Sequence, residues 1–301
     1  MNAKQHRGTI KSVSGTVLSV AHLAAEQHVI RIECPEIVDS ALPGNFVHLR
    51  CDRELAMRRP MSIMRASKNQ GWFDMLFKTV GVGTDLLSQQ SVGDEISLLG
   101  PIGVPFKLKD YRKRPLLIGG GVGIPPMIYL AEHIKDQTTS SQPIVLMGSE
   151  VPFPFQTRPS QIMSAQCPPE VLACMPLLED WKVLSRLATN QGYSGCFNGF
   201  VTDLAKYILN MNRSSLDEFE IFACGPNPML EAVKALADEF SLPCQISLEE
   251  HMACAVGGCA GCAVEIQEGQ NIAMKRVCVD GPVFEAETVI FPSKQVPRVP
   301  S

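Results

Sequence analysis

The sequence lacks two features that would direct it to a charged polymer or a membrane, namely an excess of positive charge and a long apolar run. Its 301 residues include 27 Lys and Arg against 31 Asp and Glu, a formal net charge of −4. Surfaces that bind nucleic acid or anionic lipid usually carry a basic excess, so neither partner is indicated. The N-terminal stretch MNAKQHRGTIKSVSG has no apolar signal core, and no later run approaches the roughly 18 apolar residues of a membrane span. We therefore expect a cytoplasmic protein.

Cysteine, in contrast, is plentiful. The chain has 11 cysteines, and because the cytoplasm keeps thiols reduced, clustered cysteines there indicate a metal rather than disulfides. Four of them, Cys254, Cys259, Cys262 and Cys278, have the spacing C-x4-C-x2-C-x15-C. C-x4-C-x2-C followed by a distant fourth cysteine is the plant-type ligand pattern of a [2Fe-2S] cluster. The spacing predicts that these four thiolates hold such a cluster.

Glycines surround these cysteines. We expect Gly257, Gly258 and Gly261 to adopt positive φ values and to bring backbone N–H groups toward the sulfurs, because a loop wrapped around a cluster is tight. The alternative is a structural zinc site, which usually pairs four cysteines as two C-x2-C knuckles, whereas this sequence has one such pair. Four merely buried cysteines would leave the glycines unexplained. The other seven cysteines, apart from Cys224, are expected to fill cores.

Three patterns follow one another along the chain. Residues 8–100 contain six short β-branched and aromatic runs separated by turn residues, which predicts an antiparallel barrel or sandwich. From residue 114, strands alternate with helical patterns, which indicates a parallel sheet covered by helices. The remaining glycine-, alanine- and cysteine-rich residues are too few to build much core without a staple. We expect three domains, 1–110, 111–245 and 246–301, with a proline-rich insertion at about 151–180.

The first domain carries a motif suited to a phosphorylated ligand. In RRPMSI, Arg59 can direct its guanidinium fork to a pyrophosphate, and Ser62 offers a hydroxyl to a ring edge. In the GVGT that follows, Gly81 and Gly83 allow a close backbone approach, and Thr84 opens a short helix whose N-terminus favours phosphate. An ordinary strand end with a glycine turn would explain the same residues, so the context decides.

The second domain supplies that context. Its glycine-rich turn, residues 119–123, lies between a buried strand and a helix begun by Pro125, which suits the pyrophosphate of a dinucleotide. The turn is not the G-x-G-x-x-G fingerprint, and such a turn can also be a tight connection. The later ACGPNPML repeats the arrangement, with Cys224 and Gly225 at the carboxyl end of a strand, where parallel sheets bind ligands.

In this order, RPMS, GVGT, LGPIG, GGGVGIPP and CGPNPM resemble the landmarks of the ferredoxin reductase type of flavoprotein. The cysteine pattern ending in VCVDGPVF is similar to that of the electron-transfer subunit of the NAD-dependent, heterotetrameric dihydroorotate dehydrogenase. The resemblance covers nearly the whole chain apart from the insertion. It implies a multidomain fold: an antiparallel β-barrel FAD domain, an α/β parallel-sheet nicotinamide domain and a small C-terminal [2Fe-2S] domain.

The resemblance also implies a role for each landmark. The residues contacting FAD would be Arg59, Pro60, Met61, Ser62, Leu76, Phe77, Lys78, Gly83 and Thr84. Those lining the nicotinamide side would be Gly120, Gly121, Gly123, Cys224, Gly225 and Pro226. The four clustered cysteines would be the metal ligands. Because Asn190 and Gln191 stand where the family usually has acidic residues, the choice between NAD and NADP stays open.

These cofactors define an order of electron transfer. Nicotinamide carries two electrons as a hydride, a [2Fe-2S] cluster accepts one, and a flavin can do both, so FAD stands between them. The sequence has no Ser-His-Asp arrangement and no convincing catalytic base, and His251, near the cysteines, is expected to be a packing or surface residue. We therefore expect the substrate chemistry in a partner, which the resemblance implies is an FMN-containing, dihydroorotate-oxidising flavoprotein. The alternatives are the same module in a sulfide dehydrogenase or an NADH-dependent ferredoxin:NADP oxidoreductase, and a zinc-stapled binding protein without redox activity.

Overall fold

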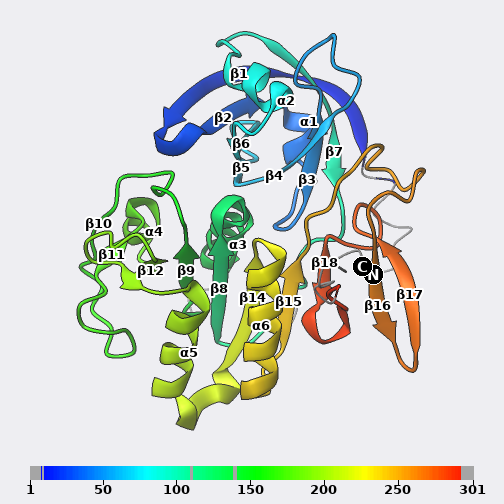
Figure 1. Ribbon diagram of the computed structural model, residues 1–301. Helices are drawn as coiled ribbons and strands as arrows, with labels where there is room; N and C mark the ends of the chain where they lie inside the picture. Colours follow the sequence, from blue (N-terminus) through cyan, green and yellow to red (C-terminus); the bar gives the residue numbers. More distant parts are fainter. Residues whose placement is uncertain (1–7, 9, 109–110, 138–140, 293–301) are drawn as a thin grey trace, which may run out of the picture.

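Two seven-stranded sheets form most of the frame of the molecule, one above the other in Figure 1. The structure, a computed structural model, describes residue 8 and residues 10–108, 111–137 and 141–292. Residue 110, the expected end of the first domain, lies outside the described residues. No helix among those described is long and apolar enough to cross a membrane.

The N-terminal sheet is antiparallel and strongly curled, with the strand order β4-β3-β7-β1-β2-β6-β5. Its strands are β1 (Lys11–Leu23), β2 (Gln27–Glu33), β3 (Phe46–Leu49), β4 (Arg59–Ser62), β5 (Arg65–Ser67), β6 (Trp72–Lys78) and β7 (Glu95–Ile102). Its two edge strands, β4 and β5, are consecutive in the chain, so residues 8–100 form seven strands where six runs were expected. Alternate side chains such as Ile30 and Ile32 point into a core that helices α1 (Pro35–Val38) and α2 (Val82–Ser88) help to fill.

The second sheet has the order β13-β12-β9-β8-β14-β15-β18 and is parallel except for β18. Its strands are β8 (Arg114–Gly120), β9 (Ile144–Gly148), β12 (Leu184–Thr189), β13 (Phe197–Asn198), β14 (Phe219–Cys224), β15 (Cys244–Ser247) and β18 (Val283–Glu285). Because side chains alternate along a strand, Leu117 packs in one core with α3 (Ile124–Gln137), while Leu116 and Ile118 pack in another with α5 (Val201–Met211) and α6 (Asn227–Phe240). The predicted alternation of strands and helices is confirmed.

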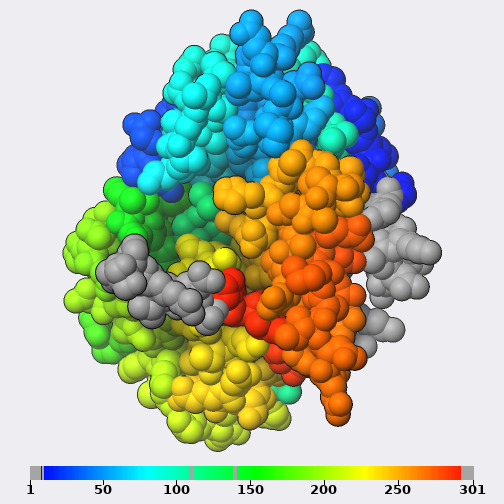
Figure 2. All heavy atoms as spheres, turned by 45° about the vertical axis from the view of Figure 1, so that its right-hand side comes forward, coloured from blue at the N-terminus to red at the C-terminus, as the bar shows by residue number. Residues whose placement is uncertain are grey.

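The C-terminal segment is continuous with the second sheet. It forms a hairpin of β16 (Ala263–Glu268) and β17 (Asn271–Arg276) and then returns as β18, where Val283 lies opposite Ser247 of β15. Strand β15 crosses the expected boundary between residues 245 and 246. Side chains such as Val277 share one hydrophobic core with Leu230 of α6. This segment, orange and red in Figures 1 and 2, therefore relies on the second sheet for its core.

The proline-rich insertion is folded. It contains the hairpin of β10 (Arg158–Pro159) and β11 (Ala173–Cys174), followed by α4 (Pro176–Asp180), on the β12 side of the second sheet.

Candidate redox site

A cavity of about 570 Å³ lies where the two sheets and the C-terminal segment meet. Its wall brings together β4, the end of β6, the turn after β8 and the loop 247–252. Eight of the nine residues predicted to contact FAD line it: Arg59, Pro60, Met61, Ser62, Leu76, Phe77, Lys78 and Thr84. A volume of this size lies in the range of about 300–1,000 Å³ that is usual for ligand sites. The structure therefore gathers the predicted flavin residues around one space, and their contact with FAD stays a prediction.

The ninth residue, Gly83, makes room for the Arg59 side chain. A Cβ at position 83 would lie 3.2 Å from both Nε and Nη2 of Arg59. The Nη1 group of Arg59 donates hydrogen bonds to the carbonyl oxygens of Met57 at 3.1 Å and Arg58 at 3.2 Å. Within the described part of the chain, no carboxylate forms an ion pair with Arg59. Its positive charge is thus available to an anionic ligand.

Helix α2 starts earlier than the sequence suggested. It begins at Val82, so Thr84 is its third residue and does not open it. The Thr84 hydroxyl instead accepts the N–H of Val80 at 2.9 Å and donates to the carbonyl of Gly81 at 3.0 Å. Thr84 therefore fixes the turn that leads from β6 into the helix.

The two glycine turns of the second sheet pack against each other. Strands β8 and β14 are neighbours, with Gly119 opposite Cys224, so the turns that follow them emerge side by side. A Cβ at Gly123 would overlap the backbone of Cys224 and Gly225, which explains the need for glycine there. Gly121 has a φ of 55° and faces open space.

The remaining predicted nicotinamide residues lie in the same place. A Cβ at Gly120 would contact Pro226 at 3.3 Å, so Gly120 and Pro226 lie close together. Val122 of the first turn and Asn227, the α6 residue directly after the second turn, line the cavity next to the predicted flavin residues. A nicotinamide ring and a flavin must be in contact for hydride transfer, and this juxtaposition allows it.

Sequence reasoning missed the loop 247–252, all of which lines the cavity. Glu249 lines the cavity, and its side chain is exposed to solvent on the cavity side. The protein packed around its carboxyl group partly desolvates it, which raises its pKa. Nearby Cys224 is buried, which raises the pKa of its thiol, so Cys224 is a neutral thiol. His251 is an exposed residue that also borders the cavity. No motif marks this loop, but it follows the carboxyl end of β15, the edge where ligands of parallel sheets bind.

The four predicted cluster ligands form two pairs. Cys262 Sγ lies 3.4 Å from Cys278 Sγ. Cys254 and Cys259 form the other pair, in which the N–H of Cys259 donates a hydrogen bond to Cys254 Sγ at 3.4 Å. Burial raises the pKa of Cys254, but hydrogen bonds from the N–H groups of Val256 and Cys259 outweigh it and lower that pKa to about 6. Burial, with the contact to Cys262, raises the pKa of Cys278 to about 12.

The glycines of this loop act differently from the expectation. Only Gly257 of the three has a positive φ, 80°, while the left-handed conformation also occurs at Ala255 and Ala260. Gly258 donates its N–H to Cys254 Sγ at 3.2 Å, and Gly261 donates to Cys259 Sγ at 3.5 Å. The expected N–H groups directed at sulfur are confirmed, whereas the positive φ values at Gly258 and Gly261 are not.

This arrangement fits a two-iron cluster. Four thiolates serve two irons, so two close pairs are the division that a [2Fe-2S] centre needs. Among the described residues, no three His, Cys, Asp or Glu side chains converge as ligands of a single metal ion. Met252 lines the cavity and Cys254 follows two residues later, a span of at most about 7 Å between Cα atoms. The ligand loop thus begins at the wall of the cavity.

Comparison with known proteins agrees with this geometry. The family model for the iron-sulfur cluster binding domain of dihydroorotate dehydrogenase B matches residues 249–290, which include the four cysteines. Among solved structures, the NADH-dependent reduced ferredoxin-NADP oxidoreductase is 26% identical with a TM-score of 0.74, covering 93% of this chain and 91% of that one. A ferredoxin NADP+ reductase from Neisseria gonorrhoeae, 16% identical with a TM-score of 0.55 over 76% of this chain and 92% of that one, shares the fold.

The fold and the site define a ferredoxin-reductase-like flavoprotein that ends in an iron-sulfur binding domain. The electron transfer subunit of dihydroorotate dehydrogenase B (NAD(+)) from Desulforamulus reducens is 30% identical over 283 residues, 93% of this chain and 99% of that one. The corresponding subunit from Caldanaerobacter subterraneus is 34% identical over 252 residues, 83% of this chain and 87% of that one. The chain belongs to the family of these electron transfer subunits.

Proposed function

We propose that this chain passes electrons between the catalytic subunit of a dihydroorotate dehydrogenase and NAD+, with FAD and one [2Fe-2S] cluster as its own cofactors. The flavin supplies the chemistry that joins the two ends, since it exchanges a hydride with nicotinamide and single electrons with the cluster. The partner, which the relatives' name implies, would oxidise dihydroorotate on its own FMN.

One observation carries this proposal: the cavity wall contains, side by side, β4, the two glycine turns and the loop that leads into the cluster cysteines. A flavin in this cavity would have the nicotinamide site on one side and the cluster on the other. The order of sites in space is therefore the order of electron carriers that a hydride donor and a one-electron acceptor require.

The residues of this chain would bind and orient the cofactors. Arg59 would neutralise the flavin pyrophosphate, and Ser62 would donate a hydrogen bond to the ring system. The glycine turns at 119–123 and 224–226 would admit the pyrophosphate and nicotinamide of the dinucleotide. Cys254, Cys259, Cys262 and Cys278 would hold the irons, with the N–H groups of the loop stabilising the thiolates.

We assign FAD to a barrel formed by residues 1–110, nicotinamide to residues 111–245 and the cluster to residues 246–301. The pairing of β15 with β18 ties the second and third of these units together, so we expect them to unfold as one. A cytoplasmic location suits the 11 free cysteines, because reducing conditions preserve thiols.

A second function is favoured by the likeness to the NADH-dependent reduced ferredoxin-NADP oxidoreductase over 93% of this chain. In that case the partner would exchange electrons with ferredoxin and NADP rather than with dihydroorotate.

Reconstitution separates the two. The chain is loaded with FAD and iron, combined with the dihydroorotate dehydrogenase catalytic subunit of the same genome, and supplied with dihydroorotate and NAD+. Formation of NADH that requires both subunits supports the proposal. A complex that forms but yields no NADH from dihydroorotate would refute the proposal. Oxidation of reduced ferredoxin with NADP+ by this chain and a different, ferredoxin-linked partner subunit would replace it with the second function.

A further inference from the structure

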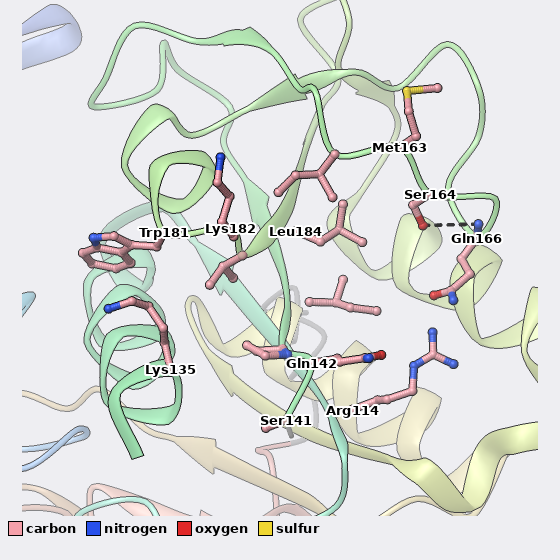
Figure 3. Close-up of a pocket in the computed structure, with 14 residues that line it drawn as sticks. Arg114, Lys135, Ser141, Gln142, Met163, Ser164, Gln166, Trp181, Lys182 and Leu184 are labelled. Carbon is pink, nitrogen blue, oxygen red and sulfur yellow. Dashed lines mark hydrogen bonds between the residues drawn. The ribbon is translucent and has the colours of Figure 1, made fainter. Parts of the chain in front are cut away.

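A second cavity, of about 470 Å³, lies at the amino ends of the parallel strands of the second sheet, away from the redox site. It is lined by residues at the start of three parallel strands, including Arg114 of β8, Ile144 of β9 and Leu184 of β12 (Figure 3). The redox cavity lies beyond the carboxyl ends of β8, β14 and β15, so the length of the parallel strands separates the two spaces. Nothing in the proposed electron path uses this second cavity.

The insertion at about 151–180 builds one wall of it. Ile162, Met163, Ser164 and Gln166 line the cavity. Sequence reasoning found no role for this proline-rich insertion. Its contribution to a cavity wall is a feature that the expected electron-transfer function does not explain.

Two buried charges fix that wall in place. Glu179, which is 5% exposed, accepts the N–H of Gln161 at 2.6 Å and the N–H of Ile162 at 3.2 Å. Arg186, which is 1% exposed, donates to the carbonyl oxygen of Ile162 at 2.8 Å. Burying a charged side chain is costly unless it is well hydrogen-bonded. The loop that forms the wall is thus held in a defined conformation.

The polar end of the cavity is built around Arg114. This residue is 8% exposed; its Nη1 donates to Asn212 Oδ1 at 2.9 Å, and its guanidinium stacks over the ring of Phe219 at 4.4 Å. Glu218, which is not part of the lining, lies 3.8 Å from Nη1. With the described residues, Nε and Nη2 of Arg114 form no hydrogen bond. One edge of an oriented guanidinium therefore remains available.

Two amide side chains extend toward Arg114 at this end, those of Gln142 and Gln166 (Figure 3). The Oε1 atom of Gln166 is buried and has no hydrogen-bond partner among the described residues. A buried polar atom without a partner is costly, and a ligand that donates or accepts a hydrogen bond here would remove that cost. This second observation also points to a ligand.

The rest of the lining sets the character of such a ligand. It contains two further cations, Lys135 and Lys182, and no Asp or Glu. The lining also has an apolar part, which includes Ile144, Ile162 and Leu184. Glu218 and Asp136, which lie outside the lining, pair with Nη1 of Arg114 and with Lys135, while Lys182 has no ion pair among the described residues. The open edge of Arg114 and Lys182 favour an anion, and the apolar part favours a hydrocarbon or ring.

We propose that this cavity binds a small organic anion, with its phosphate or carboxylate group on the free edge of Arg114 and its apolar body against Ile144 and Leu184. The site is separate from the FAD and nicotinamide sites and goes beyond the proposed electron-transfer function.

Matched probes test the site on the protein loaded with FAD and its cluster, with NAD+ present to fill the nicotinamide site. Phenyl phosphate and benzoate each carry a ring and a charge, while inorganic phosphate and benzyl alcohol carry one feature only. Saturation-transfer NMR titration should give a Kd of about 1 mM or lower for at least one ring-bearing anion, a value reasonable for about ten non-hydrogen atoms. The better binder of the two tells a phosphate site from a carboxylate site. Binding of neither, or equal binding of the single-feature probes, overturns the proposal.

Variants place the bound probe. Gln166→Glu puts a carboxylate beside Arg114 and should weaken binding by about tenfold or more, since each factor of ten is about 1.4 kcal/mol. Gln270→Glu makes the same change at an exposed residue outside the lining and should leave the Kd unchanged. Both should retain FAD. If Gln166→Glu does not fold, Lys182→Met removes an exposed cation of the lining and should also weaken binding. An unchanged Kd in every folded variant would show that the probe binds elsewhere and would refute the site.

Discussion

Replacing Arg59 with alanine should release FAD. Arg59 lines the redox cavity, its guanidinium lies against Gly83, and no carboxylate among the described residues neutralises it. Charge-assisted hydrogen bonds of this kind contribute about 1.5–3 kcal/mol. At about 1.4 kcal/mol for each factor of ten, Arg59→Ala should raise the Kd of FAD by about 10- to 150-fold.

The assay is the ratio of bound FAD to polypeptide after dialysis, followed by titration of the apoprotein with FAD. Arg59→Lys keeps the charge but loses the planar fork, so its Kd should lie between those of the wild type and Arg59→Ala. Arg53→Ala, at an exposed arginine outside the cavity, should retain FAD fully. If Arg59→Ala retains FAD as well as Arg53→Ala does, the argument that Arg59 holds the pyrophosphate is wrong.

Three further predictions follow from the same structure. Gly123→Ala places a Cβ on the backbone at the end of β14, so it should lower the free energy of unfolding by about 1–3 kcal/mol and weaken NADH binding. Gly81→Ala, whose Cβ would have nothing within 4 Å, should do neither. Equal denaturation midpoints for the two variants would contradict this. His48 is buried, and burial followed by the charge of a nearby arginine lowers its pKa from 6.5 to about 4. Stability should therefore fall as the pH falls from 6.5 toward 4. The fall should be smaller in His48→Gln than in the wild type or in His251→Gln, which changes an exposed histidine. Unfolding temperatures that fall in parallel with pH in all three proteins would refute this. The turn at residues 190–196 has no cation for a 2′-phosphate, so NADH should reduce the flavin at least about tenfold more efficiently than NADPH, and stopped-flow rates favouring NADPH would contradict this.

The sites that could be predicted from the sequence are those where adjacent residues do the work. Arg59 and Ser62 share one strand, and three of the four cysteines share one loop. Glycine turns at strand ends are also local, and the parallel order of β8 and β14 then brings two of them together. The strand and helix patterns therefore allowed each group of ligand residues to be named from the sequence, whereas the single cavity that joins them comes from the structure.

What could not be predicted depends on contacts between distant residues. The pairing of β18 with β15 joins the cluster segment to the second sheet, and nothing near Val283 signals that partner. The loop 247–252 has no motif and reaches the cavity only because β15 ends there. The insertion is ordered by Glu179 and Arg186, whose buried hydrogen bonds to residues 160–162 are invisible in a sequence rich in proline.

The choice of cysteine matters for any test of the cluster. Cys262 is 2% exposed and belongs to the core that the C-terminal segment shares with α6, so its truncation would also disturb packing. Cys259 is exposed. Removing the Cys259 side chain should therefore affect the cluster with little change in the core.

The central claim is that electrons pass between FAD and the partner through the cluster, and Cys259→Ala tests it most directly. Three thiolates cannot hold two irons as four do, so iron should be lost while FAD is retained. We expect NADH to reduce a small artificial acceptor through the flavin at close to the wild-type rate, and dihydroorotate-dependent NADH formation with the catalytic subunit to be abolished. Cys196→Ala, at a half-buried cysteine outside the ligand set, should preserve both activities. Dihydroorotate-dependent NADH formation at the wild-type rate in Cys259→Ala, with iron shown to be absent, would contradict the account.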